Sequence, residues 1–507
     1  MSPKPVADAD DGNLRSLAII CFLLLLYAFR LFLINHLPLA PDEACYWYWS
    51  KHLDWSYVDH PPMVADIIAL FTWIGGDSEF AVRIGGLLCT LISHVFLFLA
   101  VKKLSGNQTG WAWELLFVFN LTLLLSGGCI IQTPDTPLLL FWTLSLYGCT
   151  QVITGGGKGW WYLSGIALGL GLLSKYTMAL MVPCMVAFLV FSPPHRHWLL
   201  RKEPYLATLL GALVFSPVLV WNMQHRWASL AFQHAQAFSP VREPAVWKLL
   251  EYVGGQIGVI TPLLFFAFVF YSLWGCFFAR HRKNSEYLYL AIMSWPILIF
   301  FGTSTVIGEV AEPNWPAPAY IAGLPLMWIV YRQHFQKIPR HRKFVQIAIG
   351  LALIVNLLVY VHLVKPVVPL PGAMDTTRQL YGWRELGEKI ESQIEQHPWK
   401  AGYFLVGEGP PTVAELVFYT NHRYTGLDFS RPTQYTFLRG VDQLKGKNAI
   451  ILLLDLNDAT LEKVKPHFEE VTVLGKNRHY YRGELLDRLS FYILLGKAFR
   501  GNWPPTL

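Results

Sequence analysis

The chain has 507 residues, of which 53% are hydrophobic and only 15% are charged, and its mean hydropathy is +0.36. These values lie outside the usual range of soluble proteins and indicate an integral membrane protein. The net charge of +7 is modest. We expect a lipid bilayer as the main partner and no nucleic acid.

About eleven apolar stretches are long enough to cross a hydrocarbon core, which requires roughly 20 helical residues. In chain order, their approximate limits are 15–36, 80–101, 111–131, 136–154, 160–174, 176–192, 204–222, 249–277, 286–303, 317–331 and 344–364. The fifth and sixth are short and could form a broken pair. We therefore predict an all-α membrane bundle over residues 15–365, after an N-terminal tail of residues 1–14.

Lysine and arginine gather in alternate loops, and basic loops are retained on the cytoplasmic side. One set of loops holds Lys102, Lys103, Lys158, Arg196, Arg201, Lys202, Arg280, Arg282, Lys283, Arg332, Lys337, Arg340, Arg342 and Lys343. The opposite set holds only Lys51, Lys175, Arg226, Arg242 and Lys248, with Arg83 at the edge of a span. This bias predicts a cytoplasmic N-terminus, with the 37–79 loop and the C-terminal region outside. A bacterial inner membrane is the expected location.

Residues 366–507 have ordinary globular patterning and contain no cysteine, so a disulfide-stapled exterior domain is excluded. We predict a small extracytoplasmic α/β domain. Its expected helices are Trp383–Ile394 and Thr412–Tyr419, and its expected strands are Tyr403–Val406 and Ala449–Leu454. The apolar tail Leu485–Phe499 is predicted to be a core helix or a helix at the membrane interface.

The first outer loop, residues 37–79, is too long and too patterned for a simple connection. Pro41 can start a helix, and Asp42 and Glu43 then lie where the helix dipole favours anions. The aromatic run 46–49 is expected to seek the membrane interface. Two short helices along the membrane surface, joined by a Pro61-Pro62 turn, are therefore predicted to carry the chemistry of the protein.

Three acidic motifs are candidates for a site, and each could instead be a helix cap or a turn. The first is Asp42-Glu43, where a carboxylate at the level of the bilayer surface can meet a lipid-borne substrate. The second is the segment with Tyr57, Asp59 and His60, in which the prolines fix the orientation of the side chains. The third is Asp135, which lies between two prolines at the entrance to a span.

Cations are scarce in the outer loops, so each one is informative. Arg83 and Lys175 lie where charge is costly unless it is paired or functional, and Lys175 in particular requires an anionic partner. His234 lies near the expected membrane surface. Glu312 and Asn314, together with Glu309, form a polar entry into the tenth span that could equally serve helix packing.

A carboxylate base combined with several cations suits transfer from a sugar phosphate to a hydroxyl group. The base withdraws the acceptor proton, and the cations stabilise the charge that grows on the departing phosphate. A polyprenyl phosphate leaves as a stable anion, so no general acid is required. No cysteine and histidine spacing fits zinc, and no cofactor is expected, although a divalent metal remains possible.

In the order of these motifs, the chain resembles the polytopic GT-C glycosyltransferases, in particular the group of protein O-mannosyltransferases, lipid A aminoarabinose transferases and lipopolysaccharide-core transferases. The resemblance covers residues 15 to about 330. It rests on Asp42-Glu43, the His60-Pro61-Pro62 turn, Arg83, the Asp135 loop and Ser174-Lys175. The aminoarabinose transferases tend to have lysine before the proline, whereas the Asp-His-Pro-Pro form is more similar to the bacterial group that decorates lipopolysaccharide core.

The resemblance implies an inverting transfer of one sugar from a polyprenyl-phosphate donor to lipid A, lipopolysaccharide core, another envelope glycan or a protein. It implies Asp42 as the base with Glu43 in support. It also implies that Lys175 contacts the donor phosphate, and that His234 lies in a similar outer loop and contacts the phosphate too. Arg83 and His60 are further candidates for phosphate binding. We expect the acceptor to be bound, or the site supported, by Asp59, Asp135, Tyr57, Glu312 and Asn314. A transporter or lipid flippase, and a ligase that uses a pyrophosphate-linked glycan, are the alternatives.

Overall fold

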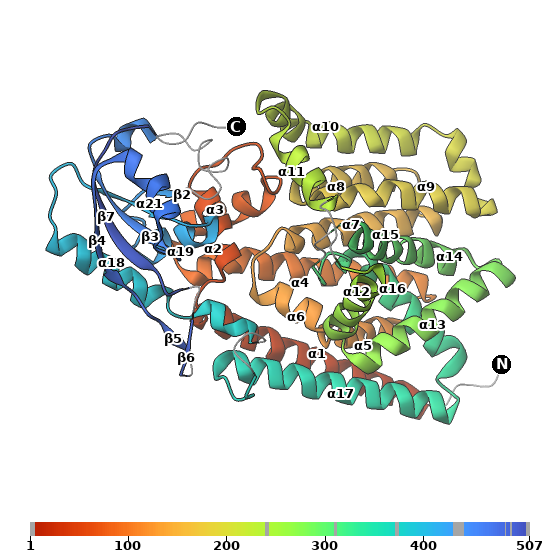
Figure 1. Ribbon diagram of the computed structural model, residues 1–507. Helices are drawn as coiled ribbons and strands as arrows, with labels where there is room; N and C mark the ends of the chain where they lie inside the picture. The colour runs from red at the N-terminus through yellow and green to blue at the C-terminus, as the bar shows by residue number, and fades with distance from the viewer. Residues whose placement is uncertain are drawn as a thin grey trace. The chain divides into compact units, whose positions relative to one another are not determined.

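The computed structural model describes residues 6–238, 243–308, 312–370, 375–428, 441–481, 483–486 and 489–502, and the predicted candidate Glu309 lies outside them. The chain divides into two compact units (Figure 1). The first comprises Met1–Ile34, Trp55–Val64 and Arg83–His362, and the second comprises Asn35–Asp54, Ala65–Val82 and Leu363–Leu507.

The first unit is helical. Its elements are α1 (Val6–His36), α4 (Glu79–Leu104), α5 (Thr109–Asn120), α6 (Leu123–Ile130), α7 (Asp135–Ile153), α8 (Trp160–Ser174), η1 (Tyr176–Leu180), α9 (Met181–Phe191), η2 (Pro193–Leu200), α10 (Glu203–Gln224), α11 (Ala228–Ala237), α12 (Ala245–Ile260), α13 (Pro262–His281), α14 (Ser285–Ile292), α15 (Trp295–Ile307), α16 (Ala317–Val330), the π-helical turn η3 (Tyr331–Phe335) and α17 (Pro339–Val364). Trp142, Phe268 and Tyr320 are fully buried in its core.

Within the described residues, seven helices are long and apolar enough to cross a membrane, or nine if each of two bent pairs counts as one span. The chain is therefore a multi-pass membrane protein, but the predicted count of eleven spans is not confirmed. The prediction of one span over 249–277 is wrong, because the backbone turns at Thr261, where φ is 75°, and Pro262 starts a new helix. Hydropathy does not register this break, because both halves are apolar.

The short helix α8 packs against α10 at close range. A Cβ atom on Gly165 would lie 2.3 Å from the carbonyl oxygen of Ala207, so only glycine allows this approach. Small residues at such crossings are typical of helices that pack within a membrane. This packing fixes the end of α8, where Lys175 follows.

The second unit combines α2 (Pro41–Ser50) and most of α3 (Met63–Gly75) with a sheet formed by the C-terminal residues. The sheet has the strand order β2-β1-β3-β7-β4. Its strands are β1 (Tyr403–Gly407), β2 (Gly426–Asp428), β3 (Asn448–Leu453), β4 (Phe468–Lys476) and β7 (Tyr492–Phe499). β1 pairs in parallel with β2 and β3, whereas β7 is antiparallel to β3 and β4. The other elements are η4 (Thr376–Leu380), α18 (Trp383–Gln396), α19 (Pro410–Tyr419), η5 (Val441–Leu444), α21 (Asp458–Val464), η6 (Lys465–His467), β5 (Tyr480–Tyr481) and β6 (Glu484–Leu485).

The predicted α/β character of the C-terminal region is confirmed, and so are its two predicted helices and two predicted strands. The helix predicted over Leu485–Phe499 is wrong, because this stretch contains β6 and β7. β7 lies between β3 and β4, and Ile493, Leu494 and Leu495 are all buried. A strand with both faces buried has no alternating pattern, so it resembles a buried helix in sequence.

Candidate functional site

Lys175 of the first unit is buried in a polar cluster. It caps the C-terminus of α8 in extended backbone, and its Nζ lies 2.8 Å from Oδ1 of Asp135, the first residue of α7. The predicted anionic partner of Lys175 is therefore Asp135. Both residues are less than one tenth exposed, at 8% and 7%.

Asn314 completes this cluster. Its Nδ2 donates to Oδ2 of Asp135 at 2.8 Å, so the aspartate bridges Lys175 and Asn314 through its two oxygens. The ring of Trp315 lies 6.0 Å from the Lys175 ammonium, within the range of a cation–π contact. An ammonium group has three N–H donors, and among the described residues only Asp135 accepts one of them. The remaining donors suit a phosphate oxygen.

The Tyr57–His60 turn belongs to the same unit. The backbone N–H of Tyr57 donates to the carbonyl oxygen of His60 at 3.0 Å, which closes the turn. The side chain of Gln233 on α11 donates to the carbonyl oxygen of Asp59 at 2.7 Å and holds this turn to α11. Burial and, to a smaller extent, the nearby charge of Lys175 together lower the pKa of His60 to about 3. His60 is therefore a neutral side chain at physiological pH.

Arg83 is buried at 2% exposure near the start of α4. Gly86 lies three residues after Arg83 on the same helix, and the side chain of Gln132 packs directly against it. A Cβ atom on Gly86 would lie only 2.0 Å from Gln132 Oε1, so only glycine leaves room for this contact. Gln132 precedes Asp135 by three residues. The close contact at Gly86 therefore fixes the loop that carries Asp135 against the helix that carries Arg83.

Two predicted site residues lie apart from these contacts. His234 is exposed on α11, and its ring lies 4.8 Å from that of Phe238. Glu312 is exposed, and its carbonyl oxygen accepts from the N–H of Trp315. The structure therefore gives Glu312 a backbone role in the loop that presents Asn314.

The Asp42-Glu43 pair lies in the second unit, in the first turn of α2, with Pro41 at the start as predicted. Glu43 is fully buried, and its Oε2 accepts from the backbone N–H of Ala40 at 2.9 Å. Glu43 therefore fixes the start of the helix. Asp42 is exposed. The pair thus divides into one capping carboxylate and one carboxylate that retains access to solvent.

The aromatic run that follows is buried in the second unit, whereas the sequence indicated a segment that seeks the membrane interface. The Trp47 ring lies 4.9 Å from Phe418 of α19, and its Nε1 donates to Asp77 at 2.8 Å. The Tyr48 hydroxyl donates to the carbonyl oxygen of Gly426 on β2 at 3.2 Å. The C-terminal sheet and its helix thereby hold the helix that carries Asp42.

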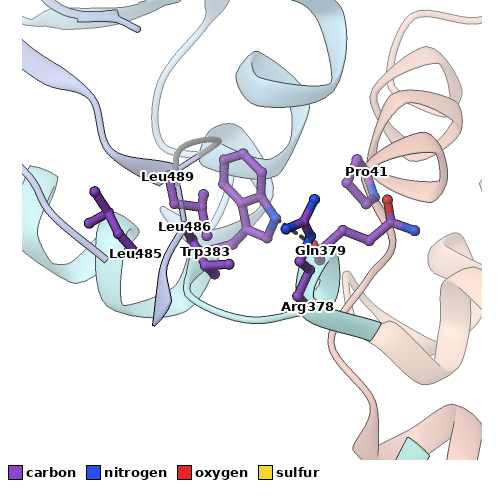
Figure 2. Close-up of a pocket in the computed structure, with 7 residues that line it drawn as sticks. All are labelled: Pro41, Arg378, Gln379, Trp383, Leu485, Leu486 and Leu489. Atoms are coloured by element: carbon purple, nitrogen blue, oxygen red, sulfur yellow. Dashed lines mark hydrogen bonds between the residues drawn. The ribbon is translucent and has the colours of Figure 1, made fainter. Parts of the chain in front are cut away.

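A small cavity lies beside the start of α2, within the second unit. Figure 2 shows Arg378, Gln379 and Trp383 facing Pro41, with Trp383 Nε1 donating to the Gln379 carbonyl oxygen at 3.0 Å. The volume is about 80 Å³, well below the several hundred Å³ of a typical ligand pocket. We therefore assign no sugar to this cavity.

Two apolar cavities flank the loop that carries Asn314. The first, of about 240 Å³, is lined by Asp135 and Asn314, by the hydroxyl residues Thr90, Ser93, Thr133 and Thr136, and by apolar residues of α5, α6 and α7. The second, of about 450 Å³, is lined almost entirely by apolar residues of α12, α13 and α15. Its lining residue Gln256 donates to the carbonyl oxygen of Pro313, next to Asn314. The first cavity suits a lipid chain that ends at the polar cluster, and the second is apolar enough to hold a further lipid chain.

Sequence reasoning missed Gln233, Trp315 and Gly86. The sequence does contain a signal for Gln233, because Ser229 and Gln233 are four residues apart and therefore share a helix face. In the structure, both polar side chains on this face make contacts, since the Ser229 hydroxyl lies 2.7 Å from the Tyr176 hydroxyl and Gln233 donates to Asp59. The roles of Trp315 and Gly86 depend on contacts between distant segments, and no local pattern marks them.

Residues 59–221 match the family described as dolichyl-phosphate-mannose-protein mannosyltransferase. The chain is 28% identical over 296 residues to the lipid A galacturonosyltransferase RgtD of Rhizobium johnstonii, a match that covers 57% of this chain and 60% of that protein. It is 31% identical over 222 residues to the undecaprenyl phosphate-alpha-4-amino-4-deoxy-L-arabinose arabinosyl transferase of Pseudomonas paraeruginosa, covering 38% and 39%. The chain thus spans less than two thirds of these relatives.

Among solved structures, ArnT from Cupriavidus metallidurans bound to undecaprenyl phosphate is similar, with a TM-score of 0.65 and 16% identity. The alignment covers 94% of this chain and 97% of ArnT. The same protein in its apo state gives the same TM-score. The chain therefore has the GT-C fold of ArnT, and its predicted resemblance to the polyprenyl-phosphate-sugar glycosyltransferases is confirmed.

Proposed function

We propose that the protein is a glycosyltransferase that moves one sugar from a polyprenyl phosphate to a glycolipid such as lipid A. The observation that carries this proposal is the Lys175 cluster, in which a buried ammonium with remaining donors lies beside apolar cavities. This arrangement suits a substrate with an anionic head and a long apolar chain. A lipid donor and a lipid acceptor together require two apolar cavities, and two flank the Asn314 loop.

The chemistry that we propose starts at Asp42. Its carboxylate removes the proton of an acceptor hydroxyl, whose oxygen then attacks the anomeric carbon of the donor sugar. The bond between that carbon and the phosphate oxygen breaks, and the phosphate leaves with the electron pair, which inverts the anomeric carbon. Lys175 and Arg83 stabilise the charge on the phosphate.

The two histidines differ from these cations in what they can contribute. Since His60 is neutral, it contacts the donor through hydrogen bonding rather than charge. We keep His234 as a predicted contact on the exposed face of α11. Because a polyprenyl monophosphate is already a stable leaving group, we propose that transfer requires no metal. Added EDTA is then expected to leave the rate unchanged.

For the location, we propose a bacterial inner membrane with the N-terminus in the cytoplasm and residues 366–507 in the periplasm. The bias of lysine and arginine between alternate loops supports this orientation. Reporter fusions at the two ends of the chain test it. A reporter active only in the cytoplasm is expected to function at the N-terminus and to fail at the C-terminus.

The purified full-length protein in proteoliposomes tests the function. Undecaprenyl phosphate carrying galacturonic acid or 4-amino-4-deoxy-arabinose is supplied with lipid A, because the relatives named above act on such sugars. Mass spectrometry is expected to show lipid A with one added sugar and an equal amount of released undecaprenyl phosphate. Movement of intact donor across the bilayer without release would contradict transfer and would indicate a flippase.

A further inference from the structure

A cationic cavity lies at the other end of α16 from the Lys175 cluster. Asn314 precedes α16 and Arg332 follows it, and 14 helical residues span roughly 20 Å. The cavity has a volume of about 420 Å³. Its lining includes Arg15, Glu114, Trp328, Arg332 and Arg342, together with aliphatic residues such as Val118 and Ile349. Figure 1 shows α1 and α17, which supply Arg15 and Arg342, running side by side.

Positive charge exceeds negative charge in this cavity. Three arginines line it, from α1, η3 and α17, and the glutamate of α5 is the one acidic residue of the lining. Arg332 Nη1 lies 3.1 Å from Glu114 Oε1, so one arginine is partly neutralised. Its Nε is buried, and in the part of the chain that the structure describes it has no hydrogen-bond partner. The cavity therefore offers unfulfilled donors and two excess positive charges.

The surroundings of the cavity are those of a membrane interface. Arg15 and Arg342 lie near the starts of two membrane-spanning helices. Leu17 on α1 and Ile347 on α17 are 56% and 51% exposed, and such apolar surface on a spanning helix faces lipid chains. Arginines near helix ends often extend separately to the bilayer surface. Here three arginines from separate segments converge on one cavity with an aromatic and aliphatic lining.

We propose that this cavity binds the phosphate head group of an anionic phospholipid, whose acyl chains lie along the exposed faces of α1 and α17. Guanidinium groups match phosphate oxygens in geometry and charge, and basic pockets between spanning helices are suited to acidic head groups. This site is separate from the Lys175 cluster and does not depend on the glycosyltransferase proposal. On the predicted orientation it faces the cytoplasmic leaflet.

Native mass spectrometry of the full-length protein in detergent tests this proposal, with phosphatidylglycerol and phosphatidylcholine of the same acyl chains as probes. The wild-type protein is expected to retain phosphatidylglycerol preferentially. The double variant R332Q/R342Q is expected to bind phosphatidylglycerol at least about tenfold more weakly, because each arginine attracts the acidic head group. Equal retention of both lipids by the wild-type protein would overturn the proposal.

Two further variants test whether weaker binding could come from the loss of surface charge in general or from misfolding. Arg280→Gln removes an exposed arginine outside the cavity and is expected to leave binding unchanged. Glu114→Gln removes the competing carboxylate and is expected to strengthen binding, a gain that misfolding cannot produce. Equal weakening by Arg280→Gln, or no gain in Glu114→Gln, would refute the site. Competition by inorganic phosphate at the concentration of the lipid would identify a site for soluble anions instead.

Discussion

The Lys175 cluster of the first unit and the Asp42-Glu43 pair of the second unit differ in how their charged side chains are buried. In the cluster, Asp135 bridges Lys175 and Asn314, so opposite charges compensate each other and join three segments of the bundle. In the pair, Glu43 is buried and fixes the helix start, while Asp42 is exposed. On the proposed mechanism, the cluster is expected to contribute both to stability and to donor binding, whereas Asp42 is expected to contribute to chemistry alone.

Among the substitutions that test this comparison, that of Asp42 has the largest expected effect on the rate of transfer. Asp42→Asn should lower kcat by about 10³-fold, since a positioned general base contributes roughly 10²–10⁴-fold. Thermal unfolding should be unchanged. Glu43→Gln is the matched control and should destabilise the protein by about 1 kcal/mol through its cap, with a smaller loss of kcat. Full transfer by Asp42→Asn would remove Asp42 from the mechanism.

The Lys175–Asp135 ion pair should show coupled effects on stability. Lys175→Met or Asp135→Asn alone leaves an uncompensated buried charge, which typically costs about 3–5 kcal/mol. The double variant should recover much of that stability in detergent unfolding measurements. It should nevertheless remain inactive, because Lys175 is also expected to bind the donor phosphate. An active double variant would show that the pair is structural only.

The contact between α4 and the Asp135 loop can be tested at Gly86. Gly86→Ala places a methyl group 2.0 Å from Gln132 Oε1, and overpacking of this kind costs about 1–3 kcal/mol. We expect a lower melting temperature and a several-fold drop in transfer. Gly350→Ala on α17 is the matched control, because its added methyl group meets no described atom within 4 Å. Equal melting temperatures in the two variants would contradict this role.

A smaller effect is expected where the C-terminal sheet holds α2. Tyr48→Phe removes the hydrogen bond to Gly426 and should cost about 1 kcal/mol. Transfer should fall modestly, because the helix that carries Asp42 is held less firmly. Tyr162→Phe is a control, since its hydroxyl has no hydrogen-bond partner among the described residues. If transfer persists unchanged while stability falls, the sheet supports the fold without positioning Asp42.

The pH dependence of the unfolding stability tests whether His60 is neutral in the folded protein. Its pKa is lowered in the folded protein to about 3, against 6.5 for an unperturbed histidine, so the unfolded chain binds the proton more tightly. The stabilisation is complete above about pH 6.5 and is lost as the pH falls toward 3. His60→Gln should therefore reduce the loss of stability on acidification, measured as melting temperature from pH 7 to 4. An unchanged slope would show that His60 is not held neutral.

The order of the motifs in sequence was enough to predict the GT-C resemblance, and hydropathy was enough to predict the membrane bundle. The positions of Pro41, Asp42 and Glu43 in a first helical turn also followed from local rules, since proline and acidic residues favour that turn. The same rules could not predict whether Asp42 or Glu43 accepts the hydrogen bond from the N–H of Ala40, because aspartate and glutamate are both favoured in the first turn of a helix.

The contacts between distant segments were decided only by the tertiary structure. Asp135 and Asn314 are 179 residues apart, and no periodicity relates them. The burial of Trp47 depends on Phe418 of the C-terminal segment, and the identity of β7 as a strand depends on its two neighbours in the sheet.

What the sequence by itself determined is therefore the membrane class, the motif order and most of the local elements, because hydropathy and backbone preference act over short distances. What only the tertiary structure decided is which charges meet, since a buried charge is tolerated only where the packed chain supplies its partner.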